Sequence, residues 1–141
     1  MFIGRHDVAV DQKGRIHLPA KIRDALEKFG GPMVLTISDR CLAGYPKSLW
    51  LDKYEALERE PYTPEKGDLL RAITENAVEL EQKNGRILLP AWLRRFADIE
   101  KDAVIVGRIK KIEIWSSGRH AKVAEGYEPE KLSGMLRKLG Y

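Results

Sequence analysis

The sequence predicts a mixed α+β, β-rich fold in which one small unit occurs twice. The first observation is an internal repeat: VDQKGRIHLPAKIR, residues 10–23, matches LEQKNGRILLPAWLR, residues 80–94. Both segments contain Gly-Arg-Ile, then Leu-Pro-Ala, then an arginine in the same order, and Arg86 follows Arg15 by 71 positions. The second observation is that the likeness continues, because LTISDRCLAGY lies opposite IVGRIKKIEIW at a spacing of 70 positions. Each half of the chain is therefore expected to be one whole unit.

Each unit is expected to contain, in order, a strand, a tight turn, a second strand, a short helix and two further strands. The expected strands of the first copy are residues 6–10, 15–18, 34–37 and 41–45. Those of the second copy are residues 77–80, 86–89, 103–106 and 111–115. Gly14 and Asn84-Gly85 mark turns that join the first two strands of each copy into a hairpin. Pro19-Ala20 and Pro90-Ala91 open the helices, because proline suits the first helical turn.

The remaining segments are expected to be helical and to lie outside the two units. Residues 60–67, EPYTPEKG, predict a linker with apolar residues at helical spacing on both sides. Near the C-terminus four apolar side chains form one stripe, and so short a helix needs a surface to pack on; they are Leu132, Met135, Leu136 and Leu139. The expected organisation is a first unit at residues 5–47, a helical linker region at 48–75, a second unit at 76–119 and a helical tail at 120–141.

The two turns carry the strongest functional signal, because each brings lysine, glycine and arginine together. Their sequences are Lys13-Gly14-Arg15 and Lys83-Asn84-Gly85-Arg86. Glycine lets a backbone approach a phosphate closely, lysine supplies charge, and arginine can bind a guanine edge through two hydrogen bonds. A single turn of this composition is more often a solvated connector. Because both copies keep these residues in the same order, we expect the turns to bind DNA.

An acidic residue precedes each turn. We align Asp11 with Glu81, so that Val8 falls on Val78 and the second copy carries one extra residue in its loop. Without that gap the side chains of a half-buried strand would change face. Both carboxylates are expected to orient the nearby arginine through hydrogen bonds rather than to act as general bases.

Four further residues recur at matched positions in the two copies. Arg23 and Arg94 are expected on solvated helix faces, with a phosphate contact or a subunit ion pair as the alternative. Tyr45 and Trp115 are expected to be core or interface aromatics.

Composition and residue types argue against several function classes. A formal charge of +4, from 25 basic and 21 acidic residues, favours an anionic partner. His6, His17 and His120 have no counterparts between the copies, so we expect no catalytic residue, no metal site and no cofactor. Cys41 is the only cysteine, which fits a reducing compartment, and no apolar run is long enough for a signal peptide or a membrane span. The expected location is the cytoplasm.

The two motifs, together with Met1-Phe2, Gly4 and the segment KIEIW, resemble the MraZ family of bacterial transcriptional regulators over nearly the whole chain. The resemblance implies two AbrB-like swapped-hairpin units in one chain, forming a pseudo-twofold, double-psi-type barrel with peripheral helices. The family motif is an Asp, three residues and an Arg, which Asp11 and Arg15 match. In the second half Arg86 matches, while the acid is either Glu81, one residue too distant, or is replaced by Gln82.

The resemblance also implies a function. It implies a non-enzymatic, sequence-specific regulator that assembles into a homo-oligomeric ring at the nucleoid. Its partner would be double-stranded DNA, at short direct repeats in the promoter of its own cell-division and cell-wall gene cluster. Two alternatives from other classes stay open: an RNA-directed or phosphate-binding enzyme that uses the same glycine turns, and a ring-forming scaffold whose loops contact protein.

Overall fold

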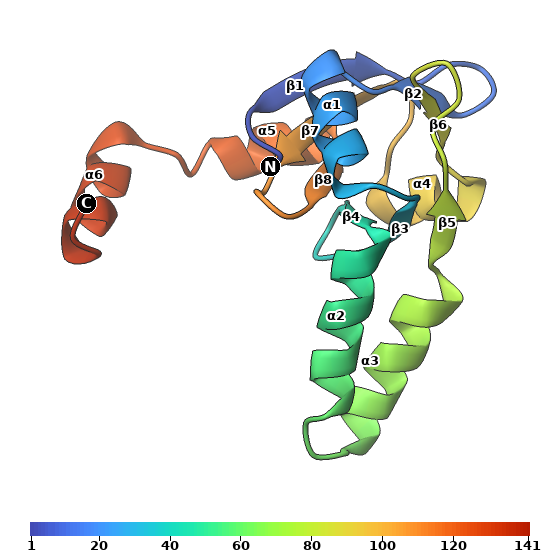
Figure 1. Cartoon of the computed structure of the whole chain (residues 1–141). Helices are drawn as coiled ribbons and strands as arrows, with labels where there is room; N and C mark the ends of the chain where they lie inside the picture. Colours follow the sequence, from blue (N-terminus) through green and yellow to red (C-terminus); the bar gives the residue numbers. More distant parts are fainter.

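The computed structural model describes all residues, 1–141, and confirms the order of elements in both halves (Figure 1). The strands are β1 (Arg5–Ala9), β2 (Arg15–His17), β3 (Met33–Ile37), β4 (Leu42–Pro46), β5 (Val78–Leu80), β6 (Arg86–Leu88), β7 (Asp102–Gly107) and β8 (Ile112–Ser116). The helices are α1 (Ala20–Phe29), α2 (Lys47–Glu58), α3 (Pro64–Glu75), α4 (Ala91–Ala97), α5 (Ser117–Ala124) and α6 (Pro129–Lys138).

The main sheet has six antiparallel strands in the order β1-β7-β8-β4-β3-β5. Reading inward from either edge gives matching strands: β1 corresponds to β5, β7 to β3 and β8 to β4. A pseudo-twofold axis therefore passes between β4 and β8, where Ala43 pairs with Glu113. The two halves share one sheet.

The expectation that the first two strands of each copy pair with each other as a hairpin is wrong. Val10 and Ile16 form a single bridge at the base of the first turn, but β1 pairs with β7 and not with β2. Instead β2 pairs with β6 of the other half to form a separate two-stranded ribbon, with Ile16 opposite Ile87. This exchange agrees with the swapped-hairpin expectation. The strands form one open six-stranded sheet and this ribbon, so the double-psi barrel is not confirmed.

One face of the sheet is closed by the ribbon and by α1 and α4. Ile16 and Ile87 are 1% and 2% exposed, and the core they join also takes Ile22 from α1 and Leu93 from α4. Each helix starts directly after a proline, Pro19 or Pro90, whose φ near −57° already suits a helix. The helices are therefore fixed at the point where each ribbon strand ends.

The opposite face carries the second helical layer. Trp115 and Val104 pack there with Cys41 and the half-buried Val123 of α5, and Tyr45 is also buried, which confirms the expectation for both aromatic residues. Arg119 of α5 links this helix to α4 and to the β3–β4 turn, because its guanidinium donates hydrogen bonds to the carbonyl oxygens of Phe96 and Arg40, each at 3.2 Å.

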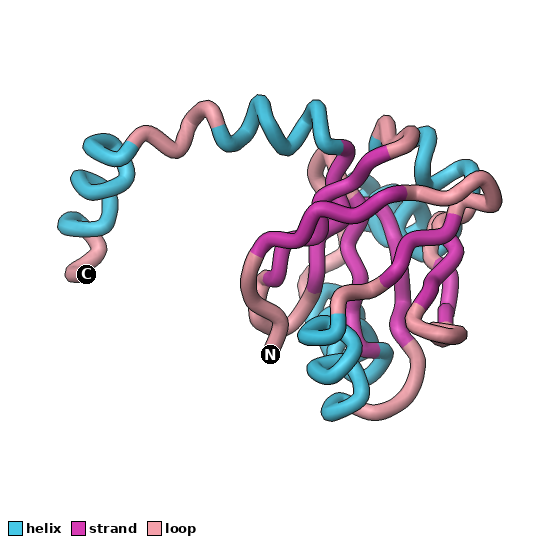
Figure 2. Tube along the Cα trace, turned by 90° about the horizontal axis from the view of Figure 1, so that it is seen from above, coloured by secondary structure: helices cyan, strands magenta, loops and turns pink.

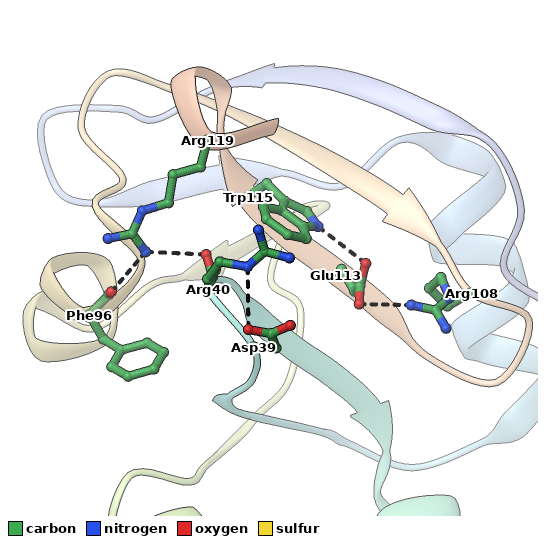
Figure 3. Close-up of polar contacts among 7 residues, drawn as sticks. All are labelled: Asp39, Arg40, Phe96, Arg108, Glu113, Trp115 and Arg119. Atoms are coloured by element: carbon green, nitrogen blue, oxygen red, sulfur yellow. Dashed lines mark hydrogen bonds and ion pairs between the residues drawn. The ribbon is translucent and has the colours of Figure 1, made fainter. Parts of the chain in front are cut away.

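Figure 3 shows the polar contacts beside this junction. The Trp115 indole N–H donates to Glu113, whose other carboxylate oxygen pairs with Arg108 at 3.0 Å. The Arg40 guanidinium lies over the Trp115 ring, 5.7 Å from its centroid, and donates to Asp39. These contacts fix the turns at this end of the sheet.

The remaining helices extend from the body. After β4, α2 and α3 form an antiparallel pair that projects from the sheet, and after α5 the chain leads to α6, which stands apart (Figures 1 and 2). The longest helices have 12 residues, and none of the helices qualifies as a membrane span.

Candidate nucleic-acid interface

Both turn arginines lie on the outer face of the β2–β6 ribbon. Since side chains alternate along a strand, burial of Ile16 and Ile87 turns Arg15 and Arg86 to the opposite face. Arg86 stands opposite His17 and Arg15 opposite Leu88 in the register. The two arginines are thus diagonal neighbours, whose backbones lie about 7–8 Å apart in an antiparallel pair. The structure brings together two residues that are 71 positions apart in the sequence.

The first turn is built on the Asp11 carboxylate. One of its oxygens accepts hydrogen bonds from the backbone N–H groups of Lys13 and Arg15, both at 2.9 Å. The other oxygen accepts from Nε of Arg15, also at 2.9 Å. Gly14 closes the turn at φ +84°, a region that a side chain makes costly. Asp11 therefore fixes both the backbone of the turn and the direction of its arginine.

These contacts also act on the ionisation of Asp11. The backbone N–H of Arg15 is the largest influence that lowers the pKa of Asp11 below its ordinary value, and the Arg15 side chain and the Lys13 N–H add to it. The carboxylate is consequently ionised at neutral pH, where it holds the turn.

The second turn has a different construction. Lys83 and Arg86 exchange two backbone hydrogen bonds, of 2.9 and 3.0 Å, across a two-residue turn. Asn84 and Gly85 both have positive φ, +54° and +78°, as a type I′ hairpin turn requires. The Gln82 side-chain oxygen accepts from the N–H of Gly85 at 2.8 Å. Arg86 is exposed and forms no ion pair, so its guanidinium is free, whereas the guanidinium of Arg15 is held by Asp11.

The strand register corrects the alignment of the two copies. Val8 pairs with Ala103 of β7, and Leu80 pairs with Met33 of β3, which is the counterpart of Ala103. Val8 therefore corresponds to Leu80 and not to Val78, and the second turn is one residue shorter than the first rather than longer. By the same register Glu81 corresponds to Ala9. The structure shows no hydrogen bond or ion pair from Glu81 to the turn, and Gln82 contacts the loop instead.

Each turn is also held by the other half of the chain. The carbonyl of Gly14 accepts from the N–H of Leu89 at 2.9 Å, and the carbonyl of Gly85 accepts from the N–H of Leu18 at 2.7 Å. The helix arginines cross in the same way. A Cβ placed on Gly14 would lie 2.9 Å from the Arg94 guanidinium carbon, and one on Gly85 would lie 2.8 Å from Arg23. Glycine is favoured at both turns because φ is positive, and a side chain there would also have to displace these guanidinium groups.

The expectation that Arg23 and Arg94 lie on solvated helix faces is therefore wrong. Both are half-buried, and Nε of Arg94 donates to the carbonyl of Leu89 at 2.9 Å. Nε of Arg23 is buried without a hydrogen-bond partner. The sequence signal for these two residues was their recurrence at matched positions in both copies. Only the exchange of strands between the halves shows that each arginine reaches the turn of the other half.

The fold and the site together define a class: a pseudo-symmetric α+β protein that presents two basic glycine turns on one two-stranded ribbon. A family profile described as "MraZ protein, putative antitoxin-like" matches residues 1–71 and 73–132. The chain belongs to the MraZ family.

Individual relatives agree with this assignment. The chain is 42% identical over 132 residues to a protein of Marinomonas sp. (strain MWYL1), covering 90% of this chain and 87% of that protein. It is 42% identical over 121 residues to a protein of Lachnoclostridium phytofermentans, with 84% of each covered, and 41% identical over 132 residues to one of Heliobacterium modesticaldum, with 92% and 90% covered. All three bear the name "Transcriptional regulator MraZ".

Proposed function

We propose that this member of the family is a sequence-specific DNA-binding transcriptional regulator without enzymatic activity. The observation that carries the proposal is the β2–β6 pairing, in which Arg15 and Arg86 are diagonal neighbours on the ribbon face opposite the buried Ile16 and Ile87. The relatives' shared name supports the regulatory role.

The physical fit is to the major groove of a duplex. A two-stranded β-ribbon is of a size that this groove admits, and an arginine there can bind both acceptors of a guanine. Lys13 and Lys83 stand beside the arginines and are exposed, so they suit phosphate contacts that position the ribbon. Gly14 and Gly85 supply the positive φ on which the turns depend, but both are buried against Arg94 and Arg23, so Asn84 is the exposed residue between Lys83 and Arg86. Asp11 orients the first arginine, whereas Gln82 rather than Glu81 supports the second turn.

The proposed target is a set of short direct repeats in the promoter of the protein's own cell-division and cell-wall gene cluster. The protein would act in the cytoplasm, at the nucleoid, as a homo-oligomeric ring. Each chain contributes two units, residues 5–47 and 76–119, with 48–75 and 120–141 as helical additions. A ring presents many identical ribbons, and repeats spaced by about one helical turn meet successive ribbons on one DNA face. Weak single contacts then add through effective concentration.

The test is DNA binding by purified protein, measured by fluorescence anisotropy on its own upstream region and on a scrambled duplex at one fixed salt concentration. Arg15→Ala and Arg86→Ala should each lose about 1–3 kcal/mol of discrimination between the two duplexes. Arg71→Ala is the matched control, because Arg71 is an exposed arginine paired with Asp68 at 2.6 Å on α3, away from the ribbon. It should bind as the wild type does.

Two outcomes would count against the proposal. Equal losses on target and scrambled DNA would reduce Arg15 to a phosphate contact. Negligible affinity for any duplex at low salt, where counterion release favours binding most, would remove DNA as the partner.

A further inference from the structure

Helix α6 is the internal counterpart of α3. Both begin with Pro-Glu-Lys, at residues 64–66 and 129–131, and both contain Leu-Arg in the next turns, at 70–71 and 136–137. Each also follows a helix that continues directly from the fourth strand of its half, α2 after β4 and α5 after β8. The repeat thus extends beyond the strands into the helical segments. The two helices nevertheless have different surroundings.

In the first half, α3 runs back alongside α2 and contacts the sheet (Figure 1). Leu70 is buried, and the hydroxyl of Thr36 in β3 donates a hydrogen bond to the carbonyl of Ile73. In the second half, α5 has only 8 residues and α6 does not fold back on it. No residue of α6 is buried, and its apolar stripe is exposed at four positions: Leu132 36%, Met135 53%, Leu136 45% and Leu139 75%. A 10-residue helix is marginal in water on its own, so α6 needs an apolar partner.

The same chain holds an unfilled apolar groove between α2, α3 and the sheet. Its volume is about 430 Å³. Aromatic and aliphatic side chains form most of its wall, namely Ile37, Tyr45, Trp50, Tyr54, Leu57, Leu69 and Ile73. Asp39, Lys53 and Lys111 also line it, and Lys111 is placed over the Tyr45 ring with Nζ 5.5 Å from the centroid. The groove is therefore suited to a short apolar helix face with polar edges.

Charge favours α6 as the occupant. Residues 47–75, which form the α2–α3 pair, carry seven acidic and five basic side chains, a net charge of −2. Residues 129–141 carry three basic side chains and one acidic, a net charge of +2. The groove wall itself carries Asp39 beside Lys53 and Lys111, so the negative charge lies on exposed acidic side chains elsewhere on α2 and α3, such as Asp52, Glu58 and Asp68. The α2–α3 pair and α6 thus carry opposite net charges.

The groove of the same chain is a poor candidate, because α6 leaves the body from α5 through residues 125–128 alone and stands well away from α2 and α3 (Figures 1 and 2). We propose that α6 of one chain docks its apolar stripe in the α2–α3 groove of a second copy. Since each chain offers one helix and one groove at different places, this joint can link copies head to tail. It rests on the homo-oligomer of the proposed function but not on DNA binding.

The first test is the mass of the protein in solution without DNA, by sedimentation velocity and light scattering over a concentration series. Leu136→Asp, on the stripe, and Leu69→Asp, at the groove, should each weaken association at least tenfold and give monomers, with unchanged circular dichroism of the body. Ser133→Asp adds the same charge off the stripe and should assemble as the wild type does. Full assembly of Leu136→Asp or a monomeric wild type would overturn the joint, while Arg15→Ala should leave the mass unchanged.

The second test identifies the occupant by disulfide cross-linking. Cys41 is buried and does not compete, so Met135→Cys and Leu69→Cys introduce the only accessible thiols. Oxidation of the mixed single variants should give a covalent dimer, and oxidation of the double variant should give covalent oligomers. Ser133→Cys replaces Met135→Cys in the control and should cross-link at least tenfold less. A double variant that forms only an intramolecular disulfide at monomer mass would show docking within one chain, and the absence of any cross-link would exclude the groove; either result overturns the proposal.

Discussion

Gly14→Ala tests whether the first turn depends on the arginine that crosses from the other half. Gly14 has φ +84°, and its new Cβ would lie 2.9 Å from both Cζ and Nη2 of Arg94. The left-handed backbone alone costs an L-residue about 1–2 kcal/mol. Displacing Arg94 also weakens its hydrogen bond to the Leu89 carbonyl, and bonds of charged groups contribute roughly 1.5–3 kcal/mol. Because the guanidinium can partly relax into solvent, we expect a total loss of about 3 kcal/mol.

The assay is urea denaturation at fixed protein concentration, followed by tryptophan fluorescence and circular dichroism. A double-mutant cycle with Arg94→Ala separates the two contributions, since removing the side chain leaves only the backbone strain. The double variant should be about 1–1.5 kcal/mol more stable than the sum of the single losses predicts. Gly118→Ala is the control, because this α5 glycine has open space around the Cβ position and should gain up to about 1 kcal/mol. A neutral Gly14→Ala, or additive losses in the cycle, would refute the crossing contact.

Three further predictions follow from the ribbon and its surroundings. Because the pKa of Asp11 is lowered, its carboxylate releases the first turn only as the pH falls through that lowered value. The NMR chemical shift of the Arg15 amide should therefore stay constant from about pH 5 to pH 8 and change in acid. An inflection near neutral pH would contradict this prediction. Burial raises the pKa of Cys41 to about 12, so Ellman's reagent at pH 8 should react with it only after unfolding, and rapid reaction of the native protein would disprove its burial. Ile87→Ala should cost about 2–5 kcal/mol of unfolding free energy, whereas Leu88→Ala on the outer face should change it by less than about 0.5 kcal/mol. Equal losses in the two variants would contradict the burial of one ribbon face only, and a larger loss for Leu88→Ala would mean that the ribbon faces the other way.

The order of the elements could be predicted from the sequence, because each copy repeats the same local signals. Alternation marks the strands, glycine marks the turns, and Pro19 and Pro90 mark the helix starts. The contact between Asp11 and Arg15 could also be predicted from the sequence, since a carboxylate four residues before an arginine can close a loop. These features depend on residues close together in the chain.

The strand partners could not be predicted in the same way. Whether β2 pairs with β1 or with β6 depends on residues 71 positions away, and both choices bury the same side of Ile16. The position of Arg94 against Gly14 follows from that exchange, so it was missed as well. The alignment of Asp11 with Glu81 failed because it was chosen to keep strand alternation, and placing Val8 on Val78 or on Leu80 keeps that alternation equally well. Only the strand register selects Leu80 and the shorter second turn.

The unequal length of the two turns has a consequence for recognition. In a symmetric dimer of identical subunits the two DNA-contacting elements are the same, so such a dimer recognises the same base sequence in both directions of its site. Here the halves are covalently fused, so the second hairpin could lose a residue and leave Arg86 unrestrained while Asp11 still holds Arg15. We expect such a reader to distinguish the two orientations of its site, which makes it suited to elements that have a polarity rather than to palindromes.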